Sequence, residues 1–203
     1  MAGKVLVRLT ALAALVSVAA LAGVGGTKPA RAGLLGCGGQ VPVQPFTPWL
    51  DSLNYTLRTT GSLESTSGWK LSGGAQVVSG NEPWRVNAAG DSHSLSLPSG
   101  SSATSPSFCV TLLHPDLRFF AVNGGSALSA LEVDATTTVL GLKVTTPVGV
   151  VLAGGTWQPT LPLPFVDGLL SLTRGTVQFR FTPVGAGSGW QIDDIYVDPF
   201  KSR

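Results

Sequence analysis

The sequence predicts an all-β domain, a sandwich or barrel of about ten short strands. Charged residues make up 12% of the chain, while glycine, serine, threonine, proline and valine are abundant. This composition favours strands joined by tight turns. Outside the N-terminal segment no window shows the 3.6-residue apolar period of a helix, and glycine pairs such as Gly73-Gly74 separate the apolar runs.

The strand-like runs extend from residue 53 to residue 197. Val177, Phe179 and Phe181 alternate with polar residues, which indicates one buried and one solvated face. We expect strands over 53–59, 69–71, 75–79, 94–97, 107–112, 118–122, 127–133, 139–145, 149–152, 176–182 and 192–197. Segment 161–170 contains Pro162 and Pro164 and is expected to form a loop or a bent edge.

Residues 1–32 have the three parts of a secretory signal peptide. Lys4 and Arg8 precede an uncharged apolar stretch over 9–24, and Ala30-Arg31-Ala32 fits the cleavage rule. The apolar run of about 16 residues is shorter than the roughly 20 that a membrane span needs. We therefore expect cleavage after Ala32 and a secreted or extracellular protein. The alternative is a lipoprotein, since residues 34–37 resemble a lipobox ending at Cys37.

Cleavage reverses the net charge. The whole chain has 13 basic and 11 acidic residues, net +2. Four basic residues leave with the signal, so nine remain against 11 acidic residues, a net charge of −2. The mature chain has no basic cluster, which argues against nucleic-acid binding. Its 171 residues suit an extended Pro/Gly-rich arm over 33–48 and one domain over 49–203.

Two cysteines, Cys37 and Cys109, remain in the mature chain. An even number in an exported protein favours a disulfide. This bridge would stabilise the fold by roughly 4 kcal/mol in the chain-entropy model. The alternative is a pair of buried free thiols.

Two motifs near the ends of the domain resemble jelly-roll carbohydrate-binding modules of the galactose-binding-like type. They are Gly61-Ser62-Leu63-Glu64, followed by Gly68-Trp69, and the ending Ile192-Asp193-Asp194-Ile195. The resemblance implies a jelly-roll β-sandwich whose first and last strands pair, with Leu63 replacing the usual phenylalanine. The chain, with its segments 80–83 and 118–120, is also similar to exported actinobacterial proteins, which implies no activity.

The same resemblance implies a structural calcium ion. In such modules calcium often lies where the glutamate of the first strand meets an aspartate of the last strand. The matching residues are Glu64 and Asp193 or Asp194, and only one of the two aspartates should face Glu64, because neighbouring strand residues point in opposite directions. Alternatively, these carboxylates accept backbone N–H bonds or pair with Arg180.

A carbohydrate site needs an aromatic platform beside planar polar side chains. Trp69 and Trp190 lie in strand motifs and are expected in the core, whereas Trp84 and Trp157 lie among turn residues. The candidate ligand-binding residues are Trp84, Trp157, Arg118, Arg180 and Gln178.

Catalysis has little support in the sequence. Gly90-Asp91-Ser92-His93 resembles a block of the SGNH esterases, but no histidine follows His114 to act as base. Two histidines and two cysteines do not form a zinc cluster with usable spacing. We therefore expect a non-catalytic exported module that binds carbohydrate or envelope glycan. The alternative is a structural or protein-interaction domain of the cell surface, for instance one that binds an envelope protein.

Overall fold

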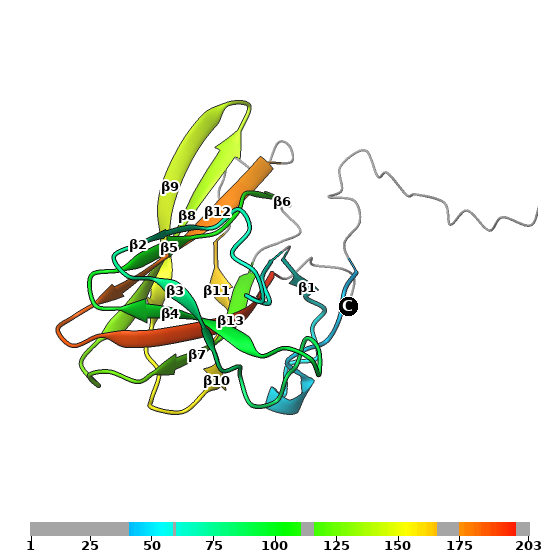
Figure 1. Cartoon of the computed structure of the whole chain (residues 1–203). Helices are drawn as coiled ribbons and strands as arrows, with labels where there is room; N and C mark the ends of the chain where they lie inside the picture. The colour runs from blue at the N-terminus through cyan, green and yellow to red at the C-terminus, as the bar shows by residue number, and fades with distance from the viewer. Residues whose placement is uncertain (1–40, 59, 111–115, 166–174, 198–203) are drawn as a thin grey trace, which may run out of the picture. The chain divides into compact units, whose positions relative to one another are not determined.

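The computed structural model describes residues 41–58, 60–110, 116–165 and 175–197, which form two antiparallel sheets (Figure 1). The seven-stranded sheet has the order β10-β7-β13-β4-β3, with β1 beside β13 and β11 beside β7. The six-stranded sheet has the order β2-β5-β12-β8-β9, with β6 beside β12. The all-β prediction is confirmed. The predicted signal peptide, residues 33–40 of the arm and Cys37 lie outside the described residues.

The strands differ widely in length, from two residues in β1, β10 and β11 to ten in β8, β9 and β12. The seven-stranded sheet contains β1 (Thr56–Leu57), β3 (Gln76–Ser79), β4 (His93–Pro98), β7 (Asp116–Asn123), β10 (Gln158–Pro159), β11 (Leu163–Pro164) and β13 (Gly189–Val197). The six-stranded sheet contains β2 (Lys70–Ser72), β5 (Ser102–Thr104), β6 (Phe108–Val110), β8 (Ala130–Val139), β9 (Leu142–Val151) and β12 (Gly175–Val184). The 3₁₀ turn η1 (Thr47–Trp49) precedes them, and no helix in the described ranges has the length and apolarity that crossing a membrane requires.

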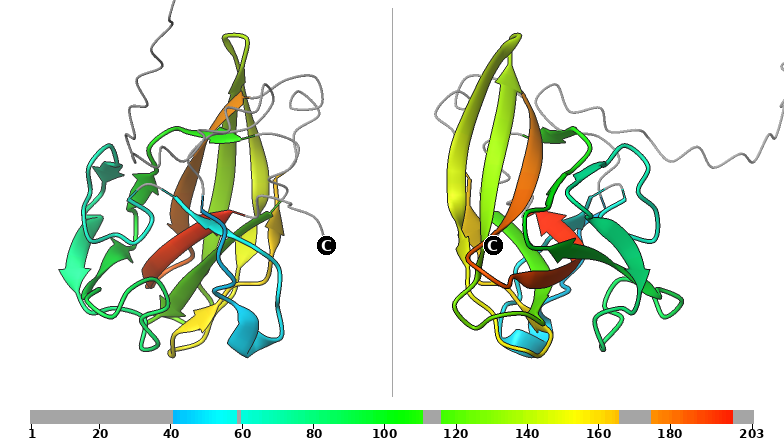
Figure 2. Two further views of the ribbon diagram at one scale, coloured as in Figure 1. Left: turned by 90° about the vertical axis from the view of Figure 1, so that its right-hand side faces the viewer. Right: turned by 60° about the vertical axis from the view of Figure 1, so that its left-hand side comes forward.

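The main core lies between the two sheets, which face each other in a jelly-roll sandwich (Figure 2). Burial alternates along β12, where Val177, Phe179 and Phe181 are fully buried, as the sequence predicts. Phe119 of β7 meets Phe181 edge-on, with ring centroids 5.2 Å apart. Trp190 is also fully buried in this core. Burial of apolar surface, worth roughly 25 cal/mol per Å², is the main attraction between the sheets.

The β8–β9 hairpin corrects two predicted strands. The expected strand over 139–145 is wrong, because Leu140 and Gly141 form a turn in which both residues have positive φ, 50° and 83°. β9 then continues to Val151, joining the two runs predicted over 139–145 and 149–152. Pro147 does not end the strand, since β9 is at the edge of its sheet and the register shifts beside it.

The Gly61–Glu64 motif is a turn and not a strand. Leu63 has a φ of 57° and is fully buried. Gly61 nevertheless meets the last strand as the resemblance implies, because Ile195 N donates to Gly61 O at 2.9 Å. The pairing of first and last strands is confirmed at β1 and β13, where Thr56 lies opposite Val197.

Candidate carbohydrate-binding face

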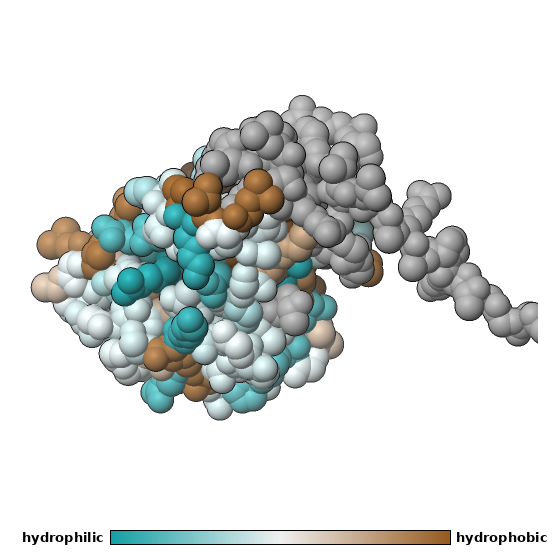
Figure 3. Space-filling model, turned by 90° about the horizontal axis from the view of Figure 1, so that it is seen from above, coloured by the Kyte–Doolittle hydropathy of each residue, from teal (hydrophilic) through white to brown (hydrophobic). Residues whose placement is uncertain are grey.

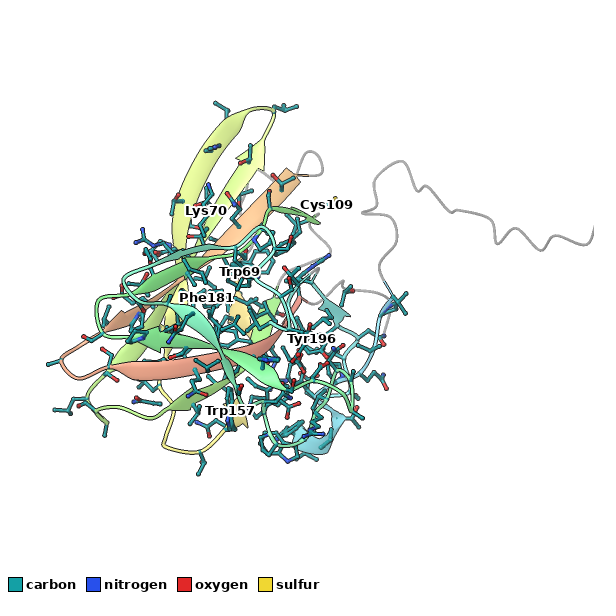
Figure 4. The ribbon with its side chains drawn as sticks, viewed as in Figure 1. Trp69, Lys70, Cys109, Trp157, Phe181 and Tyr196 are labelled. Atoms are coloured by element: carbon teal, nitrogen blue, oxygen red, sulfur yellow. The ribbon has the colours of Figure 1, made fainter. Side chains whose placement is uncertain are left out.

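The outer face of the seven-stranded sheet carries a second aromatic cluster, which we call the outer aromatic cluster. Its buried members are Phe46, Tyr55, Phe120 and Tyr196, and Trp49, Leu57, Val86 and Trp157 pack partly buried against them. Segment 46–57, loop 80–92, β7, β13 and the approach to β10 supply these residues. In Figure 4, Trp157 lies beside β10 and Tyr196 lies near the end of β13. Parts of the chain that are distant in sequence therefore meet on this face.

Trp84 is the exposed aromatic residue of this face, with 46% of its surface accessible. Its ring meets Trp49 edge-on at 4.8 Å and lies 5.7 Å from the Phe120 ring. Its backbone is also held, because the buried Glu82 carboxylate accepts bonds from Trp84 N, at 2.7 Å, and from Val86 N. The indole is thus fixed from below while part of its surface remains open to a ligand.

A row of polar side chains crosses the same sheet and reaches Val122 on β7, two residues from Phe120 of the cluster. Gln76, Ser96 and Gln191 are register partners on β3, β4 and β13, and Gln191 is also the partner of Val122 on β7. Their strand neighbours Leu95, Leu97, Trp190 and Ile192 point into the core. Alternation therefore directs the polar side chains outward, on the face that holds Phe120 and Trp84. Register partners lie about 5 Å apart, so the row can offer amide and hydroxyl groups to a single extended ligand.

Arg118 belongs to the support of this face. It is 5% exposed, its Nε donates to Thr160 O at 2.8 Å, and its Nη1 pairs with Asp51 Oδ2. The guanidinium also stacks on the Phe46 ring at 4.1 Å. Partial burial opposes ionisation of Asp51, but hydrogen bonds from Tyr55 and Leu53 and the charge of Arg118 lower its pKa below the ordinary value. Arg118 thus fastens the N-terminal segment to β7.

Gln178 and Arg180 lie on the other side of the sandwich. Both alternate with the core residues of β12 and face outward from the six-stranded sheet. Gln178 Nε2 donates to Ser105 O at 3.1 Å, and Arg180 Nη2 donates to Ser102 Oγ at 3.2 Å. The structure therefore brings Trp84 and Trp157 to one face but does not place Gln178 or Arg180 with them.

The sequence motifs did not single out the polar row or Glu82. Gln191 stands between Trp190 and Ile192, so strand alternation alone could have placed it opposite the core side. Gln76 and Ser96 have the same signal, each beside an apolar residue of a predicted strand. Glu82 had no local signal, because its partners depend on how the loop folds back on itself and on Asp193.

Buried carboxylates hold the loop that carries Trp84. Glu82 and Asp193 are fully buried, and Asp194 is 1% exposed. Asp193 Oδ2 accepts from Glu82 N at 3.1 Å, and Asp194 Oδ2 accepts from Asn87 N at 3.2 Å. None of these carboxylates takes part in an ion pair within the described residues.

Burial without a counter-ion raises the pKa of both Asp193 and Asp194. Burial and the neighbouring Asp194 raise the pKa of Asp193 to about 8. Burial and the charges of Glu82 and Asp91 raise the pKa of Asp194 to about 7. These carboxyl groups therefore keep protons up to about neutral pH, and when ionised they would place unpaired negative charge where loop 80–92 meets the end of β13.

The donor set for a cation is incomplete as it stands. In the described part of the chain no three carboxylate, imidazole or thiol groups converge as metal ligands. Glu64 is occupied elsewhere, because it accepts bonds from Ser92 N at 2.7 Å and His93 N at 2.8 Å. However, Asp194 Oδ1 is buried without a hydrogen-bond partner, as is Asn81 Oδ1. Calcium prefers oxygen ligands, so buried oxygen atoms that accept no hydrogen bond are suited to bind it.

Ser92, His93 and Glu64 meet at the surface without forming a catalytic triad. His93 Nδ1 lies 3.0 Å from Ser92 Oγ and 2.8 Å from Glu64 Oε2. One ring nitrogen thus faces both partners, whereas a triad uses the two nitrogens for the nucleophile and the carboxylate separately. These contacts fix the loop next to β4.

A groove of about 460 Å³ lies beside the candidate face, between the end of β9 and the β10–β11 segment. Its lining is mainly apolar and includes Val150, Leu152, Leu161 and Leu163, with Gln158 as a polar member. Val150, Leu152 and Leu161 are 56%, 75% and 81% exposed. The groove offers few hydrogen-bonding groups to a sugar.

No protein-family model matches the chain, and no curated protein matches it. Similar solved structures include the carbohydrate-binding module TmCBM61 in complex with β-1,4-galactotriose, at 18% identity and a TM-score of 0.42, covering 70% of this chain and 96% of that one. A CBM22-1 xylan-binding domain from Paenibacillus barcinonensis has 14% identity and a TM-score of 0.45, covering 68% and 90%. The family 11 module of a Clostridium thermocellum cellulase has 9% identity and a TM-score of 0.40, covering 70% and 93%.

An enzyme domain is also among the similar structures. The enzymatically active domain of bacteriophage CBA120 tailspike protein 4 has 19% identity and a TM-score of 0.44, covering 68% of this chain but only 21% of that one. At these identities and TM-scores the likenesses assign no function to the chain, so function has to come from the geometry of its own residues.

Proposed function

We propose that the chain is an exported, non-catalytic module that binds carbohydrate on the outer face of its seven-stranded sheet. The exposed Trp84 ring on the face that also carries the row of Gln76, Ser96 and Gln191 is the observation that carries this proposal. An aromatic ring can cover the apolar face of a sugar, while amides and hydroxyls can both donate to and accept from its hydroxyl groups. Trp157 extends the same face at its β10 side.

The rigidity of the platform supports binding with little reorganisation. Trp84 is supported by Trp49 and Phe120, and its loop is pinned by the Glu82 carboxylate. A ligand therefore does not have to order the ring, which reduces the entropy lost on binding. We include no catalytic step, because Ser92 and Glu64 share one nitrogen of His93.

A glycan array probed with the mature protein tests the proposal. The array should include β-1,4-galactotriose, xylohexaose and mixed-linkage β-1,3-1,4-tetrasaccharide. We expect binding to at least one glycan, with a loss of about tenfold or more in Trp84→Ala, as for a base or ring stacked on an aromatic side chain. Arg180→Ala is the matched control, since it removes a polar side chain from the opposite sheet, and it should bind normally. Equal losses in both variants would contradict this choice of face.

We also propose that calcium binds at the junction of loop 80–92 and β13. Asp194, with its unpartnered Oδ1, is the principal ligand, and Asp193 is a further ligand. Glu64, which the sequence also indicates, would have to give up its bonds from Ser92 N and His93 N to join them. A bound divalent cation would supply the positive charge that these carboxylates lack. Calorimetric titration with calcium tests this proposal, and heat that persists unchanged in Asp194→Asn would contradict it.

The groove beside β9 favours a second function, a protein-interaction domain of the cell surface. Its exposed Val150, Leu152 and Leu161 suit the apolar side chains of a protein partner better than a sugar. A glycan array on which no glycan binds would contradict the carbohydrate proposal. Capture of one envelope protein by the wild type and not by Leu161→Asp would then support the second function.

A further inference from the structure

The β8–β9 hairpin ends in two leucines that belong to neither apolar cluster of the described chain. Leu140 is 90% exposed and Leu142 is 63% exposed. The hairpin projects beyond the neighbouring strands at the top of Figure 1. In the view from above, brown apolar surface gathers on this side of the molecule, interrupted by hydrophilic side chains (Figure 3).

The position of Leu140 is unfavourable for the isolated fold. Its φ of 50° is left-handed, and with Gly141 it forms a two-residue turn that normally selects asparagine, aspartate or glycine. A leucine there adds backbone strain and also exposes an apolar side chain. Local folding therefore does not explain this residue, whereas a partner that buries the tip does.

Charge indicates the kind of partner. Lys143 is exposed beside the two leucines, and no acidic residue lies between Asp134 and the end of β9. The tip is thus locally cationic, although the mature chain as a whole carries more acidic than basic residues. Apolar tips flanked by a basic residue match the boundary between acyl chains and anionic headgroups.

We propose that the tip of the β8–β9 hairpin inserts into the surface of a lipid bilayer that contains anionic lipids. Leu140 and Leu142 enter the apolar boundary, and Lys143 contacts the headgroup phosphates. A two-residue turn offers too little area for a stable protein–protein interface, whereas a membrane surface can bury a few apolar side chains at its boundary. This contact is independent of the proposed carbohydrate face, because the tip lies on the six-stranded sheet.

Co-sedimentation of the mature protein with vesicles tests the proposal. One vesicle contains equal parts of phosphatidylglycerol and phosphatidylcholine, and the other contains phosphatidylcholine alone. We expect binding to the anionic vesicle and much weaker binding to the neutral one. Equal binding to both, or binding to neither, overturns the proposal.

Variants separate insertion from folding. Leu140→Asn relieves the strain at positive φ, so it should melt no lower than the wild type while its vesicle affinity falls about tenfold. Lys143→Gln should weaken binding about fivefold. The matched control is Leu128→Asn, because Leu128 is 93% exposed just before the start of β8, at the other end of that strand.

Three results would overturn insertion by the tip. The first is wild-type vesicle binding by Leu140→Asn, and the second is an equal loss of binding in Leu128→Asn. Self-association of the wild type without lipid that Leu140→Asn abolishes would assign the tip to a second copy of the chain.

Discussion

Trp190 and Trp84 have the same side chain but different surroundings, and the surroundings set their roles. Trp190 is fully buried and its Nε1 donates to Ser129 Oγ at 3.2 Å, so it has no surface for a ligand. Trp84 rests on Trp49 and Phe120 with 46% of its surface exposed. The exposed indole is therefore available for recognition, and the buried one stabilises the fold.

At the same scale, Arg118 is predicted to act in stability and not directly in binding. Arg118→Met leaves the partly buried Asp51 carboxylate without its counter-charge, which should cost more than the roughly 1 kcal/mol of a surface pair and less than the roughly 3–5 kcal/mol of a fully buried one. Urea unfolding monitored by fluorescence measures this loss. The double variant Arg118→Met/Asp51→Asn should recover part of it, because no unpaired charge is left. A loss below about 1 kcal/mol, as for a surface pair, would show that the pair is not structural.

At the scale of the element, sequence alternation predicted β12 correctly because each of its faces has a single environment. It did not find the turn at Leu140, because a leucine occupies a position where turn chemistry favours asparagine or glycine. It also missed β5, whose three residues Ser102–Thr104 carry no distinctive pattern. Such short strands are specified by their neighbours rather than by their own sequence.

The candidate site was only partly predictable for a related reason. The turn-rich surroundings of Trp84 and Trp157 indicated exposed rings, and both lie on one face. The position of Arg180 on the polar side of its strand was also correct, but alternation does not tell which sheet a strand joins. Only the tertiary structure shows that Gln191, and not Gln178, lies on the face that holds Trp84 and Trp157.

The turn between β2 and β3 supplies a prediction at the element scale. Gly73 and Gly100 both have positive φ, 61° and 78°. A Cβ on Gly73 would lie 2.3 Å from Gly100 O, whereas a Cβ on Gly100 meets nothing within 4 Å. Gly100→Ala should therefore cost about 1 kcal/mol from strain alone, and Gly73→Ala about 3 kcal/mol or more from strain and overlap. Thermal unfolding of both variants is the measurement, and equal losses would disprove the close approach.

At the scale of the whole molecule, the unpaired carboxylates make stability depend on pH. The folded-state pKa values of Asp193 and Asp194 are raised to about 8 and about 7, from the ordinary value of 3.8. Between about pH 4 and pH 8 the folded state holds protons that the unfolded state releases. The free energy of unfolding therefore falls as the pH rises through this range. Asp51 and Glu64 have lowered pKa values, so they titrate below this pH range. Their protonation as the pH falls reduces the free energy of unfolding.

The corresponding experiment compares melting temperatures with and without calcium. In chelator, we expect a lower melting temperature at pH 8 than at pH 5, and Asp194→Asn should reduce this difference. Calcium at pH 8 should raise the melting temperature of the wild type by binding the folded state. A melting temperature that is the same in chelator and in excess calcium would remove the proposed cation site.

The central claim, that carbohydrate binds beside Trp84, is tested most directly by the indole N–H resonances of the mature protein. Its five tryptophans give one ¹H–¹⁵N signal each. On titration with a glycan selected from the array, the signals of Trp84 and Trp157 should shift, while those of the buried Trp190 and of Trp69, which bonds to Thr60, stay in place. Glycan binding that moves the Trp69 signal and leaves Trp84 unchanged would contradict the account.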